Sequence, residues 1–312
     1  MSESTKNEPN GFLGKIKSTL ILKHIFNHLS KMKSLRIVKN IKKTQNRLHF
    51  NIKDYKLYSE KYTPIEIEII PIKYTQGKFI NLLEKYEKYY HIFIDSNKEE
   101  IKRNKLNEKE SVSKIRIIID YQTESLKKLF EDCEIIESIN FKKFYRNNIN
   151  DMSEMFYNCN KLKKINFSFY RADNVTNMNS MFYGCSSLEK IDMSKFNTEN
   201  VINMGWMFDR CILLKEINLS NFNTNNLKII SYMFCRCSSL NKIIFPCFNK
   251  DKEIDMRYLF YKCEKLKDVN IDNDVIIKAT NINYLFSGCS NEFIKKIKSR
   301  YKNIKLEAFF DD

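Results

Sequence analysis

The fold is decided by the stretch Val175–Phe196, whose sequence is VTNMNSMFYGCSSLEKIDMSKF. Its central element is a Met or Leu followed by a Phe and, three residues after the Phe, a Cys. The element recurs every 26 residues, with its cysteines at Cys133, Cys159, Cys185, Cys211, Cys237, Cys263 and Cys289. Seven copies in unbroken phase predict a tandem-repeat solenoid.

Each repeat combines two apolar spacings. Val175, Met178, Met181 and Phe182 are three or four positions apart or adjacent, which favours a short helix with one buried face. After them, Ile191 and Met193 are two apart, as in a strand. We therefore expect an α/β solenoid, a right-handed coil with one parallel strand and one short helix per 26-residue repeat.

Residues 185–198, CSSLEKIDMSKFNT, resemble the BspA-type leucine-rich repeat, a class found in bacterial surface proteins and many protist proteins. The resemblance covers about residues 121–290. It implies a leucine-rich-repeat solenoid that binds ligands by surface display. The exported, adhesive role of the bacterial members is not expected, because the chain starts with a polar stretch rather than a secretory signal.

Alternation along each strand predicts which polar side chains lie on the exposed face of the sheet. They are Lys164, Asn166, Ser168, Lys190, Asp192, Ser194, Glu216, Asn218, Ser220, Asp268, Asn270 and Asp272. Equivalent positions of parallel strands are roughly 5 Å apart, so these residues would form a polar ladder, interrupted at Ile244 and Pro246. The ladder either satisfies turns and solvent or forms a partner-binding surface.

The nine cysteines all follow residue 132, and seven share one phase of the repeat. Free cysteine is among the most buried residue types, so the ladder predicts small core residues stacked on one another. Zinc ligation would need clustered thiolates with histidine partners, and a disulfide framework would need an oxidising compartment. No apolar run is long enough to span a membrane. We therefore expect a reduced, cytoplasmic protein without a metal or cofactor.

The remaining chain divides by composition. Its net charge of +16 comes mostly from the first third, where residues 11–48 hold ten Lys or Arg and no Asp or Glu. The expected parts are a flexible tail at 1–10, a basic helical region at 11–48, an α/β amino-terminal cap region at 50–120, the repeats at 121–290 and a carboxy-terminal helical cap at 291–312.

The apolar skeleton of residues 20–45, with Leu22, Phe26, Leu29, Leu35 and Val38, weakly resembles an F-box. That resemblance implies docking onto a ubiquitin-ligase subunit. The Leu-Pro-x-Glu opening and the later Trp of the family are missing. The basic helices are also typical of nucleic-acid or anionic-membrane binding.

No sequence pattern predicts a reaction. The four histidines lie outside the repeats, and His24 and His28, one helical turn apart, have no acidic or cysteine neighbour to complete a metal site. Glycine-rich phosphate loops and nucleophile elbows are absent from the sequence. The leading hypothesis is a non-enzymatic protein-interaction scaffold, with an F-box-like adaptor as the first alternative.

Overall fold

The computed structural model describes residues 16–27, 29, 31–38, 41–54, 63–82, 84–167, 173–301 and 303–310. The chain forms two compact units, Met1–Thr63 and Pro64–Asp312. The tail expected at residues 1–10 and the ladder residue Ser168 lie outside the described residues.

The described residues of the first unit include the short helices α2 (Thr19–Asn27), α3 (Lys31–Val38) and α4 (Lys42–Arg47). Leu22 and Phe26, one turn apart on α2, are buried with Val38 in a small apolar cluster of their own. Arg47 at the end of α4 donates to the backbone carbonyl of Lys17, at 2.7 Å, just before α2 begins. A few apolar contacts and this tether hold the unit together.

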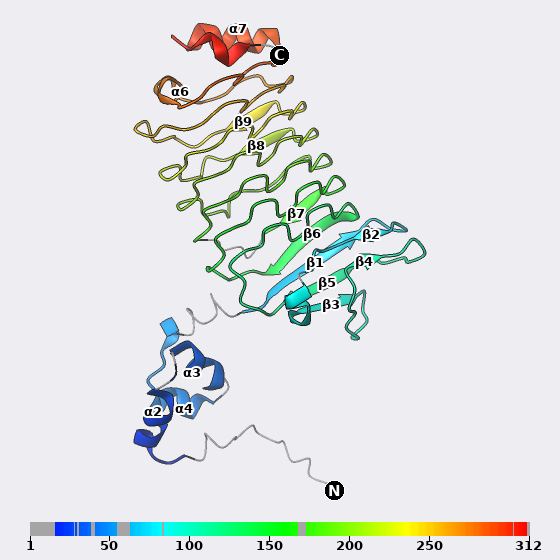
Figure 1. Ribbon diagram of the computed structural model, residues 1–312, viewed down its shortest axis with the longest axis vertical. Helices are drawn as coiled ribbons and strands as arrows, with labels where there is room; N and C mark the ends of the chain where they lie inside the picture. The colour runs from blue at the N-terminus through cyan, green and yellow to red at the C-terminus, as the bar shows by residue number, and fades with distance from the viewer. Residues whose placement is uncertain are drawn as a thin grey trace. The chain divides into compact units, whose positions relative to one another are not determined.

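The second unit begins with a five-stranded sheet in the order β3-β5-β1-β6-β7 (Figure 1). Its strands are β1 (Ile65–Pro71), β3 (Tyr90–Ile94), β5 (Ile115–Ile119), β6 (Ile136–Lys143) and β7 (Lys164–Asn166). β1 lies between β5 and β6 and is antiparallel to both, whereas β6 and β7 are parallel. The alternating Ile and Glu of β1 bury every second side chain completely, which fixes its register.

Three smaller elements complete this part of the chain. The 3-10 helix η1 (Glu84–Tyr89) precedes β3, and the two-residue strands β2 (Gly77–Lys78) and β4 (Lys105–Leu106) pair with each other in antiparallel fashion.

The fully buried Arg146 donates to the backbone carbonyls of Ile119 and Tyr121. It thereby ties the end of β5 to the start of the repeats.

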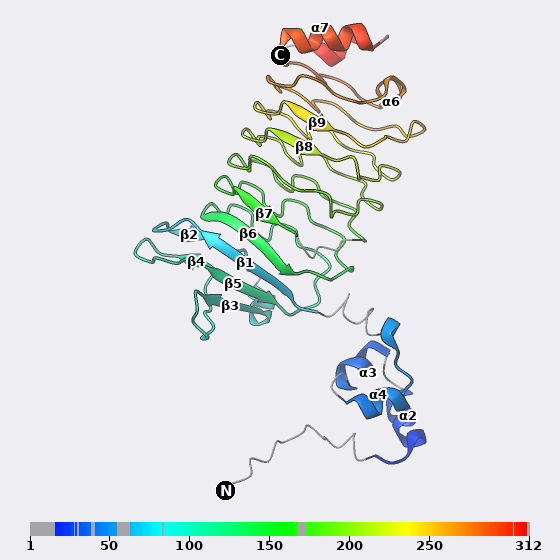
Figure 2. The same ribbon diagram turned by 180° about the vertical axis from the view of Figure 1, so that it is seen from behind.

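Beyond the sheet, successive 26-residue segments stack on one another (Figure 2). Parallel bridges connect one position of each segment to the next, at Ser125, Asp151, Asn177, Asn203, Ile229, Asp255 and Asn281. On the other side of the stack, β8 (Glu216–Asn218) and β9 (Lys242–Ile244) pair in parallel. Residues that are bridged between adjacent segments are thus 26 positions apart, which is the period of the sequence.

The expected regular α/β solenoid is wrong. The described repeats contain no helix in the Met-Phe-Cys half, and only some of them contain a strand. Instead, this half consists of two consecutive turns. In one repeat they are closed by Met155 N to Met152 O at 3.3 Å and Cys159 N to Phe156 O at 3.1 Å.

Positive backbone angles exclude a helix at these positions. The third residue of each turn has φ near +60°, as at Glu154 (58°) and Asn158 (56°), which is the requirement of a type II turn. Two such residues per repeat are incompatible with a right-handed helix. The turns place Met152, Met155, Phe156 and Cys159 on one side of the backbone, so the spacing of the buried residues imitates a helix.

The core of the repeats is a column of phenylalanine rings. Phe156, Phe182 and Phe208 are fully buried and stack at centroid distances of 5.3 to 5.4 Å, and the column continues in both directions. Beside it, the thiols of the in-phase cysteines from Cys159 onward lie within hydrogen-bond reach of the phenylalanine carbonyl of the preceding repeat, as in Cys185 Sγ to Phe156 O at 3.2 Å. The expectation that the in-phase cysteines are buried core residues is confirmed.

The stack ends on three elements, α6 (Asn273–Lys278), α7 (Asn291–Arg300) and the 3-10 helix η2 (Leu306–Phe309). Asp272 accepts from the backbone N–H of Asp274 and so begins α6, where the aromatic of earlier repeats is missing. The η2 segment takes the place of a further repeat, because Phe286 N donates to Ala308 O at 2.8 Å. Tyr284 N likewise donates to Glu307 O at 2.7 Å, so η2 accepts from two turn-side donors of the last repeat.

Candidate interaction groove

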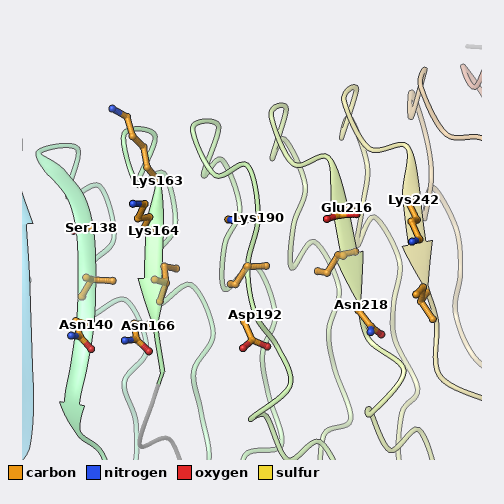
Figure 3. Close-up of a pocket in the computed structure, with 15 residues that line it drawn as sticks. Ser138, Asn140, Lys163, Lys164, Asn166, Lys190, Asp192, Glu216, Asn218 and Lys242 are labelled. Atoms are coloured by element: carbon orange, nitrogen blue, oxygen red, sulfur yellow. The ribbon is translucent and has the colours of Figure 1, made fainter.

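A groove of about 790 Å³ lies on the strand side of the stack and is lined by five successive segments (Figure 3). β6, β7, the segment 190–192, β8 and β9 each contribute residues to it. Parallel pairing fixes the register, with Ser138 opposite Lys164 and Glu216 opposite Lys242. Residues 26 positions apart therefore line the groove at equivalent places.

The lining forms two polar rows that run across the strands. The first, here called the lysine row, contains Lys164, Lys190 and Lys242, with Ser138 and Glu216 in the same line. The second, the amide row, contains Asn140, Asn166, Asp192 and Asn218 (Figure 3). The isoleucines between these positions, Ile139, Ile165, Ile191 and Ile217, have their side chains on the opposite face of the segments, in or against the hydrophobic core. The groove thus offers a cationic row and an amide row in parallel, with Ile244 opposite Asn218 at one end.

The lysines of the row form no ion pair within the described part of the chain. Among the described residues, no carboxylate lies within ion-pair distance of Lys164, Lys190 or Lys242. The adjacent sequence positions behave differently, because Lys163 pairs with Glu137 at 2.8 Å and Lys215 pairs with Glu189 at 2.7 Å. The chain neutralises the lysines beside the row and leaves those in the row unpaired.

The amide row is partly engaged in the local backbone. Asp192 accepts from the backbone N–H of Ser194 at 2.9 Å, and Asn218 accepts in the same way from Ser220. The hydroxyl and the N–H of Ser194 hold the pKa of Asp192 below its usual value, so this carboxylate is ionised at neutral pH. These bonds form Asx turns, which orient the side chains of the row.

The remaining predicted ladder residues do not line the groove. Ser194 and Ser220 complete the Asx turns. Asp268 is held by Arg300 at 2.6 Å and Lys296 at 2.7 Å of α7, and these partners, Arg300 first, keep its pKa far below the usual value. Asn270 bonds to both backbone groups of Phe245, and Asp272 begins α6. At the carboxy-terminal end of the predicted ladder, the side chains are therefore bonded to other groups of the protein.

Sequence reasoning missed four polar residues of the groove, Ser138, Asn140, Lys163 and Lys242. The period contained the signal for three of them, since Ser138 and Asn140 precede Lys164 and Asn166 by 26 residues and Lys242 follows Glu216 by the same interval. Ile244, which seemed to interrupt the ladder, lines the end of the groove.

The cysteines offer no exposed reactive thiol in the column. Burial raises the pKa of Cys159, Cys185, Cys211, Cys237 and Cys263 well above that of a free thiol, so they stay protonated. Within the described ranges, no group of three or more His, Cys, Asp or Glu side chains is placed to hold a metal ion. No described helix is long and apolar enough to cross a bilayer.

A protein-family model described as "Mycoplasma protein of unknown function, DUF285" matches residues 124–244 and 193–300. Together the two matches span more than half of the chain, and the chain belongs to this family. Because the matching model is not a leucine-rich-repeat family, the expected designation as a leucine-rich-repeat protein is wrong. No curated protein and no solved structure matches the chain.

Proposed function

We propose that this family member is a non-enzymatic interaction protein that binds an extended segment of a protein partner in the groove. The observation that carries the proposal is the lysine row, which has no ion pair among the described residues and lies beside the amide row. Like charges on neighbouring segments repel each other, so the adjacent Lys164 and Lys190 cost the folded protein free energy unless a ligand neutralises them. The lysines next to the row, Lys163 and Lys215, are neutralised by carboxylates of the protein, Glu137 and Glu189.

The dimensions of the groove favour an extended peptide. Five segments at a spacing of about 4.8 Å give a length of roughly 19 Å, which an extended chain spans with about six residues. Asn140 and Asn218 can donate to and accept from a peptide backbone. Such a surface binds a flexible segment without a deep pocket.

A pull-down from the native cell with the full chain tests the proposal. Partners recovered by the unmodified protein should be lost with Asn140→Ala combined with Asn218→Ala, because both amides line the groove and neither lies on the turn side. The matched control is Lys215→Ala, which lies one residue outside the lysine row. Recovery that is equal for all three proteins would place the partner surface elsewhere.

The first unit supports a second candidate function. Leu20, Ile21 and Ile25 of α2 are 81%, 55% and 41% exposed, in a region where all ten charged residues from 11 to 48 are basic. Exposed apolar residues at this density are typical of docking surfaces. They favour the adaptor hypothesis, in which residues 20–45 dock a ligase subunit.

Ile21→Asp with Ile25→Asp tests this second candidate, because both side chains are exposed and the buried Leu22 and Phe26 are left unchanged. Loss of ligase subunits from the pull-down would support the adaptor function. Retention on heparin that falls steeply with salt and persists in the double variant would instead assign the unit to nucleic-acid binding. Salt-dependent binding to anionic vesicles, lost in the variant, would assign it to membranes.

A further inference from the structure

The charges along the groove are distributed asymmetrically, and this asymmetry identifies the chemistry of the occupant. Lys164 and Lys190 are neighbours at one end of the row, with the uncharged Ser138 beyond them. Glu216 lies between Lys190 and Lys242 at the other end. The first end therefore has an excess of positive charge, and the second end is nearly balanced.

The excess is not removed by the rest of the groove. Asp192, the one carboxylate of the amide row, is bonded to Ser194 on the far side of the isoleucines. Lys163 adds a cation to the same end, although Glu137 pairs with it. An anionic group placed over Lys164 and Lys190 would lie between two ammonium groups that project from neighbouring segments.

We infer that the occupant is an acidic peptide segment whose carboxylates lie over Lys164 and Lys190. The amide row bonds to the backbone of the same segment. Glu216 repels a carboxylate at the opposite end, so the charge pattern fixes the direction in which the segment lies. This inference rests on the proposed function and specifies the ligand of the same groove.

A charge-swap selection tests the inference. A display library of random linear peptides is selected on three full-length proteins, namely the unmodified chain, Lys164→Glu with Lys190→Glu, and the control Lys215→Glu. Lys215 is exposed, pairs outside the groove and does not line it. The unmodified chain and the control should enrich Asp and Glu, and the double variant should enrich Lys and Arg instead.

The affinity of one selected acidic peptide for each variant measures how much the charges of the row contribute to binding. The double variant should bind it about tenfold more weakly, since two exposed ion pairs become repulsive. Glu216→Lys, which completes the row, should bind it about threefold more tightly. A gain in affinity cannot result from misfolding, and unchanged melting temperatures exclude misfolding as the cause of the loss.

The outcomes separate the two levels of the proposal. Selected peptides that lack acidic residues, but whose binding is weakened by Asn140→Ala, would overturn the acidic ligand and retain the interaction function of the groove. Peptides that bind all groove variants equally would overturn both. A response of the control equal to that of the double variant would mean that only net charge matters, and it would likewise overturn the assignment to Lys164 and Lys190.

Discussion

The two sides of each repeat differ in how many of their polar groups have partners within the protein. On the turn side, the backbone N–H groups of Met152, Glu154 and Phe156 donate to the following segment at 2.9 Å, and the same ladder recurs in later repeats. On the strand side, Lys164 and Lys190 form no ion pair with the carboxylates that the structure describes. The turn side therefore supplies the stability of the stack, and the strand side leaves interactions available to a ligand.

The largest effect is expected in the phenylalanine column. Phe182→Ala should lower the free energy of unfolding by about 3–5 kcal/mol, because the fully buried ring stacks between Phe156 and Phe208 and its loss leaves a cavity. Denaturant unfolding measures the change. A loss below about 1 kcal/mol would show that the turn side does not hold the stack together.

A buried carboxylate on the turn side gives a pH-dependent effect. Burial raises the pKa of Asp209 from 3.8 to about 6, and one of its carboxyl oxygens has no hydrogen-bond partner among the described residues. The folded protein therefore binds a proton more tightly than the unfolded chain, and this contribution to stability is present below pH 4 and lost as the pH rises through 6.

Asp209→Asn removes that dependence. Relative to the unmodified chain, the variant should gain about 2–3 kcal/mol of stability between pH 4 and pH 7, because its amide does not ionise. Unfolding curves at both pH values measure the difference between the two proteins. If that difference were the same at pH 4 and pH 7, Asp209 would titrate alike in the folded and unfolded chain.

A smaller effect is expected for the cysteine column. Cys211→Ala should cost about 1–2 kcal/mol, since it removes a fully buried sulfur and its contact with Phe182 O at 3.2 Å. Cys247, which is exposed and outside the column, provides the matched control, and Cys247→Ala should change stability by less than about 0.5 kcal/mol. Equal costs at the two positions would contradict the role of the column.

The smallest effect on stability is expected in the groove. Lys190→Ala should change the free energy of unfolding by less than about 0.5 kcal/mol, or stabilise the protein slightly, because it relieves repulsion from Lys164. Denaturant unfolding checks this directly. A marked destabilisation would mean that the lysine row is part of the scaffold rather than a surface held for a ligand.

The sequence predicted the period, the buried residues and most of the groove, because these depend on spacing and polarity. It failed on the helix because Met152, Met155, Phe156 and Cys159 have the same spacing in tandem turns as on a helix face. Gly184 and Gly288 mark the left-handed position in two repeats, but Arg210, Arg236 and Lys262 occupy it in others and conceal the signal.

The limits of the groove also depended on tertiary structure. Asp268 belongs to the same sequence ladder as Lys190 and Asp192, yet α7 supplies Lys296 and Arg300 to neutralise it. Those partners are about 30 positions away in sequence. A periodic pattern identifies equivalent positions, but it does not show which of them a later helix will pair.

Hydrogen exchange with and without a selected acidic peptide tests the division between the two sides most directly. The account predicts slower exchange confined to β6, β7, the segment 190–192, β8 and β9, with the turn-side amides of Met152, Phe156 and Phe182 unchanged. Slower exchange that is spread over both sides, or located only on the turn side, would contradict it.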